Sequence, residues 1–156
     1  MSTNITKGIR FEGSGQFLEW GKFIDPLIRK FNGTKEIYSD RMVYNWGKQS
    51  ILNGLELELT TIFWNVGLQR WCRRFTKIEY LAIGDEIAKH ELTRISNHLI
   101  SLYGQPSVSE DDVDNNEKYL LWKLDKIEVS VYYFEQHCYK LHFCIHKKKR
   151  FSFPIT

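Results

Sequence analysis

Cysteine is scarce in this sequence, and the few cysteines form no recognisable pattern. The 156 residues include three, Cys72, Cys138 and Cys144, with no C-x-x-C pair. An odd number of cysteines without such a pair is typical of free thiols in a reducing compartment, not of a disulfide framework. The sequence therefore argues against a small domain held together by disulfide bonds.

Long apolar runs and targeting signals are also lacking. No stretch approaches the roughly 20 apolar residues that a membrane-spanning helix needs. Residues 1–7 lack the basic start and apolar core of a signal peptide. We therefore expect a cytoplasmic protein that does not contact a membrane.

The composition itself is that of a folded protein. Hydrophobic residues make up 42% of the chain, aromatic residues 15% and charged residues 26%, with a formal net charge of +3. A chain of this length buries enough surface to fold without a metal or disulfide bonds. We expect a single domain over residues 1–156.

Two stretches of the sequence run in parallel. One opens with residues 6–9 and the other with residues 76–79, and both of these segments begin Thr-Lys. Each stretch then has a strand-like run, a polar break, a helical pattern that ends in glycine, and a tryptophan. The corresponding positions are Gly33 and Gly104, and Trp46 and Trp122. The sequence thus predicts two pseudo-repeat halves, about 5–70 and 75–150.

Apolar spacing predicts one long helix and one short one. Ile87, Leu92, Ile95, Leu99 and Leu102 follow helical spacing, which predicts a helix over residues 85–103, closed by Gly104. Asp25-Pro26 is typical of an N-cap followed by the first helical residue, and it predicts a helix of about two turns.

Alternating residues predict antiparallel strands. In residues 55–63, successive side chains alternate between two faces of a predicted strand, which follows Asn53-Gly54, a pair typical of a type I′ turn. Residues 127–134 and 139–146 show the same alternation and are predicted to form a long hairpin. Residues 107–118 are acidic and predict a solvated loop. The predicted fold class is α+β: an antiparallel sheet with two helices packed on one face, built from pseudo-duplicated β-α-β units.

The most chemical-looking residues are His142, Cys144 and His146, which share one face of the last predicted strand. Residues two apart on a strand are about 6.5–7 Å apart, which suits one metal ion poorly. The sequence has no motif of a cysteine hydrolase either. We therefore predict no metal, no cofactor, no catalytic residue and no enzyme activity.

Two basic segments raise the question of nucleic-acid binding. Residues 70–77 interleave cations with aromatics, and residues 147–150 are all basic. The small net charge and the acidic segment 107–118 oppose a broad polyanion-binding surface. Nucleic acid is therefore the less favoured partner.

We expect a non-enzymatic protein that binds a macromolecular partner, such as an immunity-type inhibitor of a toxin, an adaptor or a chaperone. The predicted partner-binding residues are Asp111, Asp112 and Asp114, which would attract a basic surface, and Tyr132, which would be an aromatic anchor. The alternative is a small-ligand binder or enzyme with a site between the two halves. A deep pocket containing His142, Cys144 and a carboxylate would favour that alternative.

Overall fold

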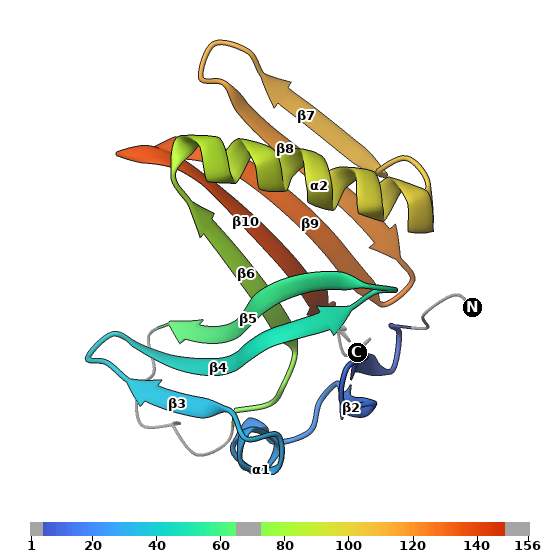
Figure 1. Ribbon diagram of the computed structural model, residues 1–156, viewed down its shortest axis with the longest axis vertical. Helices are drawn as coiled ribbons and strands as arrows, with labels where there is room; N and C mark the ends of the chain where they lie inside the picture. Colours follow the sequence, from blue (N-terminus) through green and yellow to red (C-terminus); the bar gives the residue numbers. More distant parts are fainter. Residues whose placement is uncertain (1–4, 65–72, 149–156) are drawn as a thin grey trace, which may run out of the picture.

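A large antiparallel sheet forms most of the protein (Figure 1). The computed structural model describes residues 5–64 and 73–148. Eight strands make up this sheet in the order β3-β4-β5-β6-β10-β9-β8-β7, and β1 and β2 form a separate two-stranded sheet.

The strands are β1 (Gly8–Phe11), β2 (Gln16–Glu19), β3 (Thr34–Ile37), β4 (Arg41–Ile51), β5 (Leu55–Trp64), β6 (Lys77–Ile83), β7 (Val108–Asp112), β8 (Glu117–Leu124), β9 (Ile127–Gln136) and β10 (Cys138–Lys147). The described helices are α1 (Ile24–Lys30) and α2 (Asp85–Tyr103). The antiparallel α+β class predicted from the sequence is confirmed, as are the long helix and the long β9–β10 hairpin.

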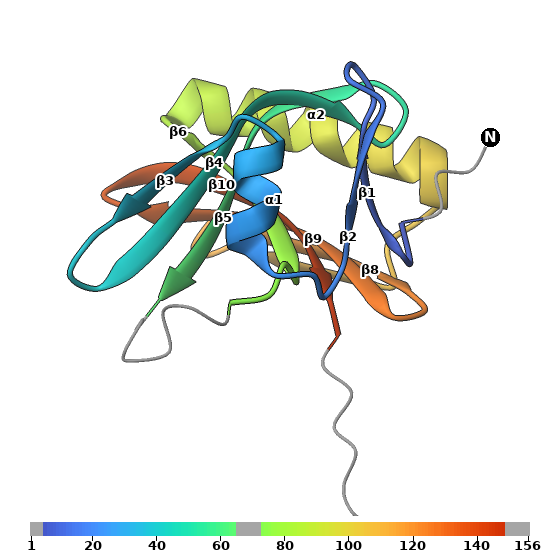
Figure 2. The same ribbon diagram turned by 90° about the horizontal axis from the view of Figure 1, so that it is seen from below.

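The longer helix lies across one side of the sheet and closes the main core. α2 contacts β6, β9 and β10, whereas α1 lies against β3 (Figure 2). On α2, Ile95 and Leu99 are fully buried, and Leu141, Phe143 and Ile145 of β10 are buried too. The helix ends because Gly104 adopts a positive φ of 76° while its N–H still bonds the Ile100 carbonyl. None of the described helices is both long and apolar enough to cross a membrane.

Three local predictions were wrong. Residues 108–112 form strand β7 rather than part of a loop, because an edge strand with exposed side chains has the composition of a loop. A three-residue connection, Leu52 to Gly54, replaces the predicted two-residue turn, since Ile51 pairs with Leu55. Asp25 does not cap α1; the N-cap is Phe23, and the Asp25 carboxylate instead lies 2.7 Å from Lys35 Nζ.

The predicted duplication is not confirmed. After each helix the chain forms consecutive antiparallel strands, and Trp46 and Trp122 both lie in the second of these, β4 and β8. Before the helices the halves differ: β1 and β2 pair only with each other, whereas β6 lies inside the large sheet. The repeat and the shared helix face remain predictions.

Candidate functional site

The side of the sheet turned away from α2 carries the candidate site. Alternate residues of β8, β9 and β10 point to that side, and no described helix packs against it (Figure 2). We call this surface the open face. It has an acidic, aromatic region on β7–β9 and a basic region on β6 and β10.

Three aromatic rings in contact form the centre of the acidic region. Tyr132 stacks on Phe134 with ring centroids 4.7 Å apart, and it meets Tyr119 edge-on at 6.1 Å. The Tyr132 hydroxyl donates to Glu117 Oε2 at 2.9 Å. A hollow of about 410 Å³ lies here, lined by Glu110, Asp112, Glu117, Lys118, Tyr119 and Tyr132.

The structure brings together only part of the predicted partner-binding set. Asp112 and Tyr132 line the same hollow. Asp111 lines a different hollow and pairs with Lys118 Nζ at 3.1 Å. Asp114 lies at the β7–β8 turn, where its N–H donates to Asp112 Oδ1. The hydrogen bonds from Asn115 and Asp114 hold the pKa of Asp112 below its usual value.

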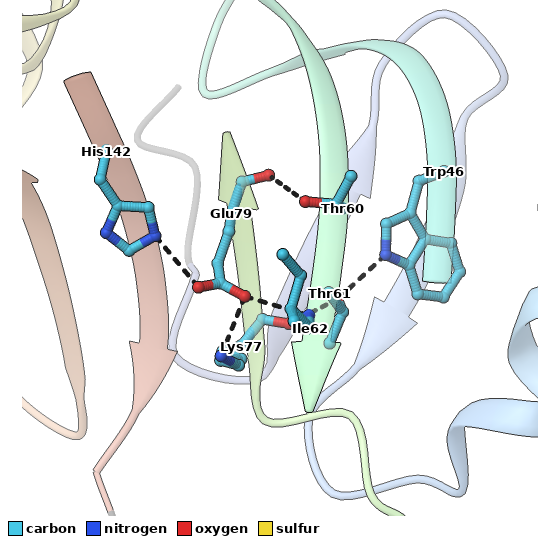
Figure 3. Close-up of polar contacts among 7 residues, drawn as sticks. All are labelled: Trp46, Thr60, Thr61, Ile62, Lys77, Glu79 and His142. Carbon is cyan, nitrogen blue, oxygen red and sulfur yellow. Dashed lines mark hydrogen bonds and ion pairs between the residues drawn. The ribbon is translucent and has the colours of Figure 1, made fainter. Parts of the chain in front are cut away.

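The two parts of the large sheet meet at a weak join between β5 and β6. The only residue pair linking these strands is Thr60 with Glu79. Side chains complete the join (Figure 3): Thr60 Oγ1 donates to the Glu79 carbonyl at 3.5 Å, and Thr61 Oγ1 donates to the Lys77 carbonyl at 2.8 Å. Trp46 Nε1 in turn donates to Thr61 Oγ1 at 3.0 Å.

Glu79 is the centre of this join. Its carboxylate lies 3.0 Å from His142 Nε2 and 2.9 Å from Lys77 Nζ, and it accepts the Ile62 N–H at 3.1 Å (Figure 3). Burial alone would raise the pKa of Glu79, but the bonds from His142, Lys77 and Ile62 outweigh it and lower the pKa overall. We call Lys77, Glu79 and His142 the seam cluster.

A basic groove runs beside the seam cluster. Its volume is about 880 Å³, and a second hollow of about 830 Å³ shares four of its lining residues, Arg74, Thr76, Lys147 and Lys148. We call the two together the seam groove. Their Lys, Arg and acidic lining residues are Arg73, Arg74, Lys77, Lys126, Lys147, Lys148, Glu79 and Asp125.

The groove unites the described parts of the two basic segments found in the sequence. The Lys147 N–H donates to the Thr76 carbonyl at 2.8 Å, so the end of β10 lies beside the start of β6. Residues 70–72 and 149–150 of those segments, Cys72 among them, lie outside the described residues.

His142, Cys144 and Glu79 all line the seam groove, as the ligand-binding alternative required. The groove is an open one, however, and burial raises the pKa of the Cys144 thiol to about 12. Such a thiol is protonated at neutral pH and is a poor nucleophile. Within residues 5–64 and 73–148, no group of three or more His, Cys, Asp or Glu side chains is placed to hold a metal ion.

No pattern in the sequence indicates the role of Glu79. It lies in an ordinary alternating strand segment, and its partners Ile62 and His142 are distant in sequence. Only the order of β5, β6 and β10 in the sheet brings these residues together. The chain matches no protein-family model, no curated protein and no solved structure.

Proposed function

We propose that the protein binds a basic protein partner through the acidic, aromatic region of its open face and catalyses no reaction. The observation that carries this proposal is the half-buried cluster of the Tyr119, Tyr132 and Phe134 rings on the open face, beside the carboxylates of Glu110 and Asp112. Aromatic anchors surrounded by charge are typical of binding hot spots. An immunity-type inhibitor of a toxin, an adaptor or a chaperone would act in this way.

The residues with catalytic potential support a binding role. Glu79 is occupied by three partners that hold β5, β6 and β10 together, so its carboxylate is not available as a general base. The raised pKa of Cys144 removes the candidate nucleophile. A small-ligand site between the halves would rely on the same Glu79 and Cys144, and neither side chain is available for catalysis.

A photo-crosslinking experiment tests the proposal. A benzophenone amino acid replaces Tyr132 on the open face and, as the matched control, Ile87 on α2, whose exposed fraction is 58%. We expect position 132 to give a discrete crosslinked protein in native cells, identifiable by mass spectrometry. Equal crosslinking at both positions, or none at position 132, would contradict the proposed interface.

Once the partner is purified, its binding kinetics test the individual residues. Tyr132→Ala should raise the dissociation rate about tenfold or more, because it removes an aromatic anchor. Asp112→Asn should lower the association rate about twofold at low salt, because exposed charges mainly steer encounter. Surface plasmon resonance at two salt concentrations measures both rates.

Asp111→Asn is the matched control for Asp112→Asn. It removes the same charge, but Asp111 does not line the hollow around Tyr132 and is already paired with Lys118. The asparagine at position 112 keeps the side-chain oxygen that accepts the Asp114 and Asn115 N–H groups. Identical rates for wild type, Asp112→Asn and Tyr132→Ala would exclude this region as the interface.

A further inference from the structure

The seam groove is a second, chemically different surface. Six Lys and Arg side chains line it, against the two carboxylates of Glu79 and Asp125. Two of these cations are already paired with carboxylates: Lys77 Nζ lies 2.9 Å from Glu79, and Lys148 Nζ lies 3.4 Å from Glu128. A groove with this excess of positive charge attracts an anionic ligand.

The acidic residues of β7 lie far from the basic residues of the seam groove, and this removes the main argument from the sequence against binding of a polyanion. The acidic strand β7 is at one edge of the large sheet, and β10, β9 and β8 lie between it and β6. The acidic segment therefore does not compete for the cations of the seam groove. A net charge of only +3 thus conceals a locally basic surface.

The shape of the groove indicates an extended ligand. Two hollows that share four lining residues form one path from Phe63 and His142 to Lys126 at the far end. Cations occur along the whole path instead of converging on one point. A positively charged groove that follows a chain of phosphates is typical of single-strand binding proteins.

Two arginines in this region are held against aromatic rings. The guanidinium carbon of Arg74 lies 4.5 Å from the Phe23 ring centroid, and that of Arg73 lies 5.5 Å from Phe63. A guanidinium held over a ring keeps its other face available for an unpaired base.

We propose that the seam groove binds single-stranded nucleic acid, with phosphates on its Lys and Arg side chains and bases against Arg73 and Arg74. This activity goes beyond the protein-binding role of the acidic region. Binding would depend little on sequence, because the donors address the backbone.

Fluorescence anisotropy of the full chain with labelled 20-nucleotide single strands tests the proposal. We expect micromolar binding at 50 mM salt and a slope of log affinity against log salt of about −3, as for roughly four phosphate contacts. The same titration with an RNA strand and with a DNA strand establishes which sugar the groove prefers. Two competitors of comparable charge, inorganic polyphosphate and a polyglutamate peptide, should displace the strand poorly.

The matched variants carry the same change in net charge. Arg73→Gln with Lys147→Gln, in the groove, should weaken binding at least tenfold and make the salt slope shallower by about 1.4. Lys126→Gln with Lys148→Gln, both in the lining of the second hollow, should act in the same direction if the first pair unfolds the protein. Lys30→Gln with Lys89→Gln, on α1 and α2 outside the groove, should change affinity less than twofold.

Three results would overturn the proposal. One is the absence of binding to either strand, and another is an equal loss of affinity in the groove and control variants. The third is displacement by polyphosphate or polyglutamate as strong as by unlabelled strand, which would assign the groove to another class of anion.

Discussion

Trp46→Ala should lower the free energy of unfolding by about 4 kcal/mol, the largest effect of a single change that we expect. Trp46 is 3% exposed, and its ring meets those of Phe11, Phe31 and Phe75 at centroid distances of 6.1, 6.5 and 5.6 Å. Truncation would leave a cavity where these side chains from several elements meet. Urea unfolding followed by circular dichroism measures the change.

Trp46→Phe separates the ring from its hydrogen bond. Phenylalanine keeps most of the aromatic packing but removes the Nε1 donor to Thr61 Oγ1, a hydroxyl that still donates to the Lys77 carbonyl. We expect a loss of about 1–2 kcal/mol, which combines the lost hydrogen bond with the smaller ring. If Trp46→Ala cost no more than Trp46→Phe, the aromatic cluster would not be a principal part of the core.

Glu79→Ala should cost about 3 kcal/mol at neutral pH, because it leaves Lys77, His142 and the Ile62 N–H without their shared acceptor. The effect should depend on pH. The pKa of Glu79 is lower in the folded than in the unfolded state, so its ionisation stabilises the fold above the unfolded-state pKa. That contribution is lost as the pH falls through the folded-state pKa.

The measurement is urea unfolding of wild type and variant at pH 7, 5 and 3. The difference in unfolding free energy should be large at pH 7 and should shrink below a pH of about 4.3, the ordinary glutamate pKa. Glu79→Gln keeps an acceptor for the Ile62 N–H but carries no charge, so it should lose the pH-dependent part only. A difference that stayed constant from pH 7 to pH 3 would show that Glu79 acts by packing alone.

The periodicity of apolar residues correctly predicted the helix and strands in which buried and exposed side chains follow a regular pattern. The alternation of β9 and β10 stands out because one face of each strand is buried against the core. The apolar stripe of α2 is buried at Ile95 and Leu99, but its first predicted member, Ile87, is 58% exposed. Strand β7 has no such periodicity because its side chains are mostly exposed, and an exposed edge strand presents no apolar face. The seam cluster was missed for another reason: sequence patterns do not reveal which distant strands become neighbours.

Among the predicted binding residues, those on consecutive strands lie together, and contacts between distant strands were not predicted. Asp112 and Tyr132 meet in one hollow because β7, β8 and β9 are consecutive strands, and consecutive strands commonly pair. Asp111 was assigned to the same surface, but neighbouring residues of a strand point to opposite faces. The two basic segments converge only because β10 inserts beside β6, which no local pattern indicated.

The position of β10 also determines when the sheet can be completed during synthesis. β6 shares a single residue pair with β5, and its long partner is β10, the last strand within the described part of the chain. A ribosome therefore releases β6 and α2 well before the strand that completes their pairing. During that interval the edge of β6, with Leu81 and Ile83, lacks its long partner and is open to pairing with other chains. Completion of the chain therefore competes with aggregation until β10 pairs with β6.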